Sequence, residues 1–554
     1  MNLPRDDKTP RTTATPRDDP FVRYGARMLD PVTSVPRSGG SPPAPTAYRA
    51  DTLTVSADTR AEALAILDRL AETAKAHSPS LALAGPNPFE ENRDEPDSEH
   101  SRRARMLQRA AELELPLAFP VRFALNPDEG PAVVDVWPLL VSYRSSVGDE
   151  ERRVGLDHLM SSAASIEGSP FMSGTALILG NPFMSGTAVI QGNPFMSGTA
   201  AGVYSYLAAG SGGRGPVSVI AQPPRGTDSV FRPHAVVLDT GVDPTHPWLG
   251  AASVRVGMQF ASPTNPNNPI GMDPNDPDVQ RTDPEGAGAV PDPMTGLLAS
   301  HAGHGTFITG LLRQACPEAV ITAIRVMEGD GVVPETALTD ALTGVAIVQA
   351  DAQSAGSQTI DAVVLSLGYY AEVDDASYTA VLRKILLALS RMNVAVFCAA
   401  GNDTTMRRFY PAAFSEDPAF QDVDHLPLAA VAALNPDASV ALFSNEGPWV
   451  NAEAPGVNLI STAPVNPRVR GAWTPDTWLV GPASTRRATV DPDSFGSGFA
   501  TWSGTSFAAP VLAGRYLAGL VTSKFPLTVQ GRRGLLTFRR TRDAKATRDT
   551  FAPG

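Results

Sequence analysis

Cysteine is scarce in this sequence, with only two among 554 residues, Cys316 and Cys398. Both stand in apolar segments beside expected secondary structure, so we expect two reduced core residues, with a single disulfide as the alternative.

Long apolar runs are also lacking, because no stretch approaches the ~18 residues of a membrane span. The segment before Pro20 has no apolar signal-peptide core. These absences predict a cytoplasmic protein that does not bind membranes, with secretion as the alternative.

A concentrated basic surface is absent as well. The formal net charge is −13, and clustered Lys and Arg occur only in the C-terminal tail. Phosphate binding generally needs such a surface, so no nucleic-acid partner is expected. Apolar residues at 42% and charged residues at 19% are sufficient for globular domains. The length predicts two or three folded units joined by linkers.

The chain divides into five segments by composition and periodicity. The N-terminal segment mixes charge, threonine and proline without periodicity, which predicts disorder. A small α/β domain, a linker, a larger α/β domain and a basic tail follow it. The expected boundaries are 1–46 for the disordered segment, 47–160 for the small domain, 161–225 for the linker, 226–530 for the large domain and 531–554 for the tail.

The linker contains a repeat. Between residues 168 and 200, Pro-Phe-Met-Ser-Gly-Thr-Ala occurs three times, at a spacing of 12 residues. Turn-forming residues surround each Phe-Met pair, which fits a stack of short strands and turns or a flexible tether. A protein recruited to a partner or an assembly through these repeats is therefore the alternative function.

From about residue 233 the chain alternates short apolar runs with segments of helical spacing. This rhythm predicts a three-layer α/β domain with a mostly parallel central sheet. The expected strands are 235–238, 320–326, 362–367 and 394–399, and the expected helices cover 338–348, 381–389 and 511–520.

Four motifs of this domain carry groups suited to catalysis. Asp239 ends a strand in Asp-Thr-Gly, His304 begins a helix in Gly-His-Gly-Thr, Asn402 follows a strand, and Ser506 begins a helix in Gly-Thr-Ser-Phe-Ala-Ala-Pro. Histidine can exchange a proton near neutral pH. A fixed amide and a helix N-terminus can both stabilise a developing oxyanion. Each motif alone also fits an ordinary turn or helix cap.

Metal binding is a weaker interpretation. His301 precedes His304 by three residues, but no cysteine or carboxylate stands at ligand spacing, so no metal site is expected there. The acidic loop at 262–297 lacks a recognised calcium spacing, so we expect a solvated loop and no required cofactor. Calcium is the alternative, with these candidate ligands: Asp273, Asp276, Asp278, Asp283 and Glu285.

In the chain order Asp, His, Asn, Ser, the four motifs resemble those of the subtilisin-like (S8) peptidase family. The similarity extends over about residues 233–525. It implies a serine endopeptidase in which Ser506 is the nucleophile and His304 the general base and acid. Asp239 would orient the imidazole, and Asn402 would donate to the oxyanion with the Ser506 N–H.

The resemblance also implies a substrate site. Protein or peptide substrates would lie extended against Ser366, Leu367 and Gly368, pairing backbone to backbone. Phe409 stands where many relatives have glycine at the floor of the first specificity pocket, which implies a shallow pocket and a small residue before the scissile bond. The small domain at 47–160 has the position of the family's inhibitory propeptide, so regulation by the N-terminal region is expected.

Overall fold

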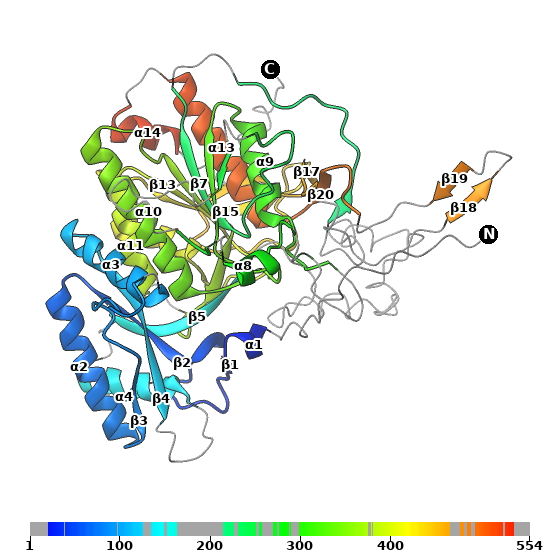
Figure 1. Cartoon of the computed structure of the whole chain (residues 1–554). Coiled ribbons are helices and arrows are strands. Elements are labelled where there is room, and N and C mark those ends of the chain that lie inside the picture. Colours follow the sequence, from blue (N-terminus) through cyan, green and yellow to red (C-terminus); the bar gives the residue numbers. More distant parts are fainter. Residues whose placement is uncertain are drawn as a thin grey trace.

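The computed structural model contains a small N-terminal α/β domain followed by a larger α/β domain (Figure 1). The three repeats and residues 1–19 lie outside the described residues. The residues that the structure describes are 20–37, 39–96, 98–125, 134–148, 152–162, 214–226, 231–250, 254–256, 270–273, 276–286, 289, 298–374, 378, 380–465, 477–480, 485–488, 494–523 and 527–536.

The N-terminal domain is an antiparallel sheet with helices packed on it. Its elements are α1 (Pro20–Arg23), β1 (Ala26–Leu29), β2 (Thr46–Ala57), α2 (Arg60–His77), β3 (Leu81–Ala84), α3 (Glu99–Glu112), β4 (Leu117–Leu125), α4 (Val136–Val147) and β5 (Val154–Ser162). Helices α2 and α4 pack on the sheet, and two helices of the larger domain also contact it. Strand β2 is buried at almost every position, as a strand covered on both faces must be.

The larger domain is built on a seven-stranded sheet in the order β16-β15-β13-β11-β7-β9-β8, with parallel pairing throughout. These strands are β7 (His234–Asp239), β8 (Val254–Val256), β9 (Val320–Arg325), β11 (Ala362–Leu365), β13 (Ala395–Ala399), β15 (Leu428–Leu434) and β16 (Ala452–Pro455). Because alternate residues of a strand face opposite sides, two apolar clusters form. One packs α9 (His304–Ala315) and α13 (Thr505–Thr522), and the other packs α10 (Glu335–Ala355) and α11 (Val381–Arg391).

This arrangement is the expected three-layer α/β domain with a parallel sheet. Its shorter elements are α8 (Pro277–Arg281), β14 (Phe409–Tyr410), η3 (Ala412–Glu416), α12 (Pro418–Gln421), β17 (Leu459–Thr462), β18 (Thr477–Val480), β19 (Thr485–Ala488), β20 (Phe499–Trp502) and α14 (Val529–Leu535). Strand β6 (Gly215–Pro216), just after the repeats, pairs with β20.

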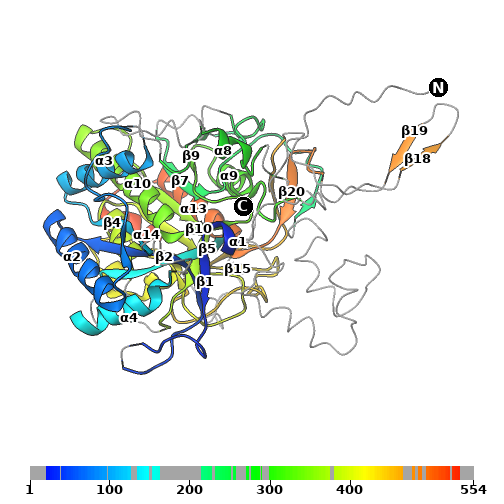
Figure 2. The same ribbon diagram turned by 60° about the horizontal axis from the view of Figure 1, so that its bottom comes forward.

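The two domains share a second sheet, which the sequence did not predict. Its order is β14-β12-β5-β2-β4-β3, and β5 also pairs with β10 (Val332–Pro334). Strand β5 belongs to the N-terminal domain, whereas β10 and β12 (Leu367–Tyr370) belong to the larger one. Figure 2 shows β5 and β10 side by side at the junction of the domains. The register pairs Ser162 with Leu367 and Ser161 with both Gly368 and Val332.

Two predicted boundaries are corrected. Disorder was expected up to residue 46, but β1 pairs with β2 within that segment, because the edge of β2 offers backbone groups that β1 satisfies. The basic tail was expected to start at 531, but α14 continues to Leu535. There Arg532 forms an ion pair with the buried Asp361. Local composition carried no signal for either long-range contact.

The cysteines are both buried and free, as expected for reduced core residues. Burial raises the pKa of the Cys316 thiol to about 11 and that of Cys398 further still. Among the helices that the structure describes, none has the length and apolar character needed to cross a membrane.

Helices α3 and α10 lie side by side where the domains meet (Figure 1). Charged side chains join the two helices. Arg103 binds Asp340 at 2.7 Å, and Arg109 binds Asp351 at 2.7 Å. Burial raises the pKa of the Asp340 carboxyl, although the charge of Arg103 opposes that rise. The carboxylate therefore depends on a partner from the other domain to offset its desolvation.

We predict that Arg103→Ala destabilises the intact chain by about 1–3 kcal/mol, because it leaves the partly buried Asp340 carboxylate without its charged partner. Thermal unfolding of the full chain measures the effect. Arg105→Ala is the matched control on the same helix, since Arg105 donates to Pro96 O within its own domain. Equal melting temperatures for the two variants would contradict the role given to Arg103.

Candidate active site

The structure brings Asp239 and His304 together at the carboxyl edge of the parallel sheet. Asp239 is the last residue of β7, His304 is the first residue of α9, and both are buried. His304 Nδ1 lies 2.7 Å from Asp239 Oδ1. A carboxylate in this position accepts the Nδ1 proton and so leaves Nε2 as the basic nitrogen of the ring.

The glycines of the Gly-His-Gly motif permit this close approach. Gly303 has a φ of +80°, which favours glycine, and a Cβ there would lie 2.6 Å from Pro464 Cδ. A Cβ on Gly305 would overlap Gly241 O in the turn that follows Asp239. The helix can therefore bring His304 against the end of β7 only without side chains at these two positions.

Ser506 and Asn402 lie at the same edge. Ser506 is the second residue of α13, and its Oγ donates to Ser366 O at 3.0 Å. Asn402 follows β13, and its Oδ1 accepts from Thr505 N at 3.0 Å and from Thr505 Oγ1 at 2.9 Å. These two bonds fix the orientation of the Asn402 amide, because they use its oxygen as the acceptor and leave Nδ2 as the donor. The amide lies next to the N-terminus of the helix that bears Ser506.

A residue of the N-terminal domain reaches this group. Ser162, the last residue of β5, has its Oγ 3.2 Å from His304 Nε2. The basic nitrogen of His304 is therefore engaged by Ser162, while Ser506 Oγ is engaged by Ser366. Sequence reasoning missed Ser162, because nothing in its neighbourhood marks it as a partner of a histidine 142 positions away.

The expected substrate-binding residues lie beside the same group of side chains. Leu367 and Gly368 pair with β5, and Ser366 Oγ donates to Ser506 O at 2.7 Å. Phe409 is buried in β14, next to β12. A Cβ on Gly368 would overlap the Phe409 ring, and a Cβ on Gly401 would lie 3.2 Å from Phe409 Cδ1. The ring thus fills the space between β12 and the turn that carries Asn402.

Glu285 is the functional candidate that sequence reasoning assigned to another role. It was a possible calcium ligand in an acidic loop, but it is buried beside Asp239. Its Oε1 accepts from Thr240 Oγ1 at 2.5 Å and from Gly305 N at 3.2 Å, and its Oε2 accepts from Thr306 Oγ1 at 2.6 Å. Glu285 therefore joins the turn after β7 to the first turn of α9, which are the two segments that carry Asp239 and His304.

The pKa of the Glu285 carboxyl is far above its usual value. Burial raises its pKa to about 8, against the lowering effect of the hydrogen bonds from Thr240 and Thr306. The nearby charges of Asp283 and Asp239 add to the rise. At neutral pH this carboxyl is therefore largely protonated, which avoids placing a second negative charge beside Asp239.

The His304 ring is enclosed by aromatic side chains, with Trp502 and Phe507 at centroid distances of 5.4 and 5.3 Å. Arg214, the first described residue after the repeats, is buried over Trp502 and donates to the carbonyl oxygens of Ala299 and Ala302. Ser162 and Arg214, which lie on either side of the repeats in the sequence, are thus both close to the His304 region.

His301, the second histidine weighed for a metal site, lies close to His304. Their rings lie 5.6 Å apart, and His301 Nδ1 bonds Ser300 Oγ at 2.8 Å. Burial lowers the pKa of His301 well below its usual range. Within the described part of the chain, no group of three or more His, Cys, Asp or Glu side chains is placed to hold a metal ion. The solvated acidic loop with no required cofactor stays a prediction, with calcium binding as its alternative.

Serine hydrolases use four such groups for acyl transfer: a carboxylate, an imidazole, a serine and a fixed hydrogen-bond donor. In this chain all four lie at one edge of the parallel sheet. A family model described as the subtilase family, Peptidase_S8, matches residues 236–541. The chain belongs to the subtilase family.

Two curated proteins and a solved structure are similar to parts of this chain. The thermophilic serine proteinase of Bacillus sp. (strain AK1) is 27% identical over 52% of this chain and 51% of that protein. The intracellular serine protease of Paenibacillus polymyxa is 24% identical over 50% of this chain and 63% of that protein. The chain thus spans about half to three fifths of these curated relatives. A crystal structure of a cold adapted subtilisin-like serine proteinase is 20% identical over 60% of this chain and 91% of that one, with a TM-score of 0.35.

We predict that Glu285→Gln flattens the pH dependence of stability. Folding raises the Glu285 pKa from 4.5 to about 8. The contribution of this carboxyl to the free energy of unfolding is therefore fully present below pH 4.5 and is lost as the pH rises toward 8. Chemical denaturation at several pH values should show a wild-type slope steeper than that of the variant by up to about 1.4 kcal/mol per pH unit. The control is Asp278→Asn, in the same loop but exposed, which should keep the wild-type slope. Parallel curves for wild type and Glu285→Gln would show that Glu285 does not hold its proton.

Proposed function

We propose that this protein is a serine endopeptidase that hydrolyses peptide bonds through an acyl-enzyme intermediate, and that its N-terminal domain keeps it inactive. The observation that carries the proposal is the position of β5. An extended segment of the chain's own N-terminal domain lies in the cleft between β10 and β12 and ends at His304.

In the proposed reaction, Ser506 Oγ attacks the substrate carbonyl and His304 Nε2 takes its proton. The 2.7 Å bond from His304 Nδ1 to Asp239 supports this, because it fixes the tautomer and stabilises the imidazolium that forms. Asn402 Nδ2 and the Ser506 N–H would donate to the oxyanion of the tetrahedral intermediate. His304 then protonates the leaving amine, and a water activated by the same nitrogen hydrolyses the acyl-enzyme.

A substrate would bind where β5 lies, as an added strand between β10 and β12. The antiparallel pairing of Ser162 with Leu367 defines the register. Extending it by one residue places the next substrate position opposite Ser366, whose carbonyl accepts from Ser506 Oγ. The scissile bond would therefore follow the position that corresponds to residue 163. In this chain that residue is Ala163, a small side chain of the kind expected from the resemblance.

Inhibition by the N-terminal domain follows from the same contacts. While β5 is in place, a substrate strand cannot reach β10 or β12, and His304 Nε2 is engaged by Ser162. Active enzyme would require cleavage after Ala163 and departure of β5. The docked domain is held by a broad interface with α10 and α11, so cleavage alone would leave it bound for a time.

We predict that Ser506→Ala abolishes both labelling by a fluorophosphonate probe and cleavage of the chain at Ala163–Ala164. Turnover of a peptide substrate should fall at least about 10⁴-fold, because the attacking hydroxyl is lost. Gel fluorescence, mass spectrometry of the new N-terminus and peptide assays measure the three effects. Wild-type chain should label slowly before cleavage and faster after release of the N-terminal fragment. Labelling that survives in Ser506→Ala would move the nucleophile elsewhere, and a wild type that never labels would rule out the peptidase.

We also predict that Phe409→Gly shifts specificity toward large aromatic residues before the scissile bond, by about tenfold or more in kcat/KM relative to alanine. Removing the ring opens the space between Gly368 and Gly401. A peptide library varied at that position gives the ratio for each enzyme. Phe420→Ala is the control, since Phe420 is equally buried but packs against Phe414, away from the cleft. If wild type already prefers large aromatics, Phe409 does not limit the pocket.

A further inference from the structure

A pair of buried carboxylates lies in the cleft, close to the inhibitory strand. Glu335 is the first residue of α10, immediately after β10, and Glu372 lies just beyond β12. Both are essentially inaccessible to solvent. They belong to the larger domain and stand on opposite sides of the path that β5 takes through the cleft. Two carboxylates buried this closely need cationic partners.

Both partners come from the N-terminal domain. The His158 ring of β5 bridges the carboxylates, with Nδ1 2.7 Å from Glu335 Oε2 and Nε2 3.1 Å from Glu372 Oε2. Arg144 of α4 donates to the other oxygen of Glu372 at 3.0 Å. Departure of the N-terminal domain would therefore remove both cations together and leave the carboxylates facing an open cleft.

An aromatic face completes the site. Tyr369 of β12 stacks on the His158 ring, with centroids 4.2 Å apart and an interplanar angle of 19°, and its hydroxyl donates to Glu335 Oε1 at 3.3 Å. A flat cation between an aromatic ring and two carboxylates is stabilised by both. Burial lowers the pKa of His158, but hydrogen bonds to Glu335 and Glu372 and their charges outweigh that effect and raise it to about 9. The imidazole is accordingly held as a cation at neutral pH.

We propose that Glu335, Glu372 and Tyr369 form a substrate subsite for a basic side chain, which His158 occupies in the intact chain. This inference rests on the proposed peptidase function and on the register of β5. His158 lies four residues before Ser162, so the subsite takes the sixth residue before the scissile bond. Once β5 has left, the enzyme selects extended peptides that carry arginine or lysine at that position.

The strand direction supports the assignment. Side chains of a strand alternate between its two faces, so the positions of His158, Met160 and Ser162 point to the same side. Met160 is fully buried, and Ser162 reaches His304. In a substrate strand of the same register, the sixth residue before the scissile bond would therefore place its side chain between Glu335 and Glu372. The scissile carbonyl of that substrate would lie at Ser506.

The test uses the full-length protein after its own cleavage, with peptides that copy residues 155–168 and carry Arg, Lys, Gln or Glu at position 158. We expect kcat/KM to be at least about tenfold higher for Arg and Lys than for Gln, and lowest for Glu, as expected for a desolvated charged hydrogen bond. Glu372→Gln and Glu335→Gln should each reduce the preference for Arg over Gln to a few-fold or less. Two variants are used because either one alone can affect folding.

The matched control is Asp437→Asn, an exposed carboxylate in a loop outside the cleft, which should keep the wild-type preference. Equal cleavage of the Arg and Gln peptides by wild type would overturn the subsite while leaving the peptidase intact. An unchanged preference in both Glu variants would also overturn it. If wild type cleaves no peptide and does not label with fluorophosphonate, the proposed function fails and the subsite fails with it.

Discussion

The pairing of β5 with β10 and β12 is the contact on which the rest of this molecule depends. Backbone hydrogen bonds join a strand of the N-terminal domain to two strands of the larger domain, so one sheet runs through both. An edge strand offers unpaired N–H and C=O groups to any extended segment. The larger domain has two such edges facing each other, β10 and β12, and β5 satisfies both. The geometry that would suit this place to the proposed peptide binding thus keeps it filled.

Side chains then decide how β5 sits between those edges. Backbone pairing alone specifies register weakly, because similar hydrogen bonds can form after a slip along the strand. A slip of one residue would, however, turn every side chain to the other face, so the side chains can fix the register. The contacts of His158 with Glu335 and Glu372 lie on one side of the strand, and a slip would leave both carboxylates buried without a cation. Buried ion pairs add little net stability, but a missing partner costs several kcal/mol. The charged contacts therefore serve mainly to fix the register that brings Ser162 to His304.

Much of the larger domain could be predicted from the sequence, because its signals are local. Apolar runs mark the strands of the parallel sheet, and the Asp239, His304, Asn402 and Ser506 motifs lie where those strands and helices end. The position of Glu285 could not be predicted in the same way. Its neighbours in sequence are acidic and turn-forming, as in a solvated loop, and only the fold places it under Thr240 and Thr306. The insertion of β5 likewise depends on pairing between segments about 200 positions apart.

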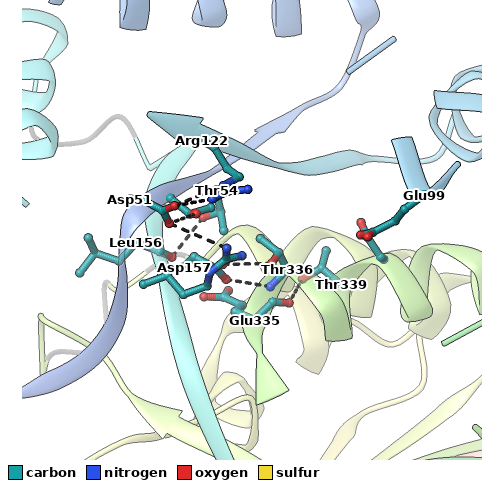
Figure 3. A network of polar contacts seen from close by, with 12 residues as sticks. Asp51, Thr54, Glu99, Arg122, Leu156, Asp157, Glu335, Thr336 and Thr339 are labelled. Carbon is teal, nitrogen blue, oxygen red and sulfur yellow. Dashed lines mark hydrogen bonds and ion pairs between the residues drawn. The ribbon is translucent and has the colours of Figure 1, made fainter. Parts of the chain in front are cut away.

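Asp157, next to His158, links the two domains in another way. Helix α10 begins after Pro334, which cannot cap it with a side chain, and the Asp157 carboxylate accepts from Thr336 N and Thr336 Oγ1 at 3.0 Å each (Figure 3). A helix of the larger domain thus receives its N-terminal cap from the N-terminal domain. If β5 left as proposed, the Thr336 amide would lose its acceptor and the first turn of α10 would be free to fray. The rate at which that one amide exchanges its hydrogen with solvent would therefore report, from within the larger domain, whether the N-terminal domain is docked.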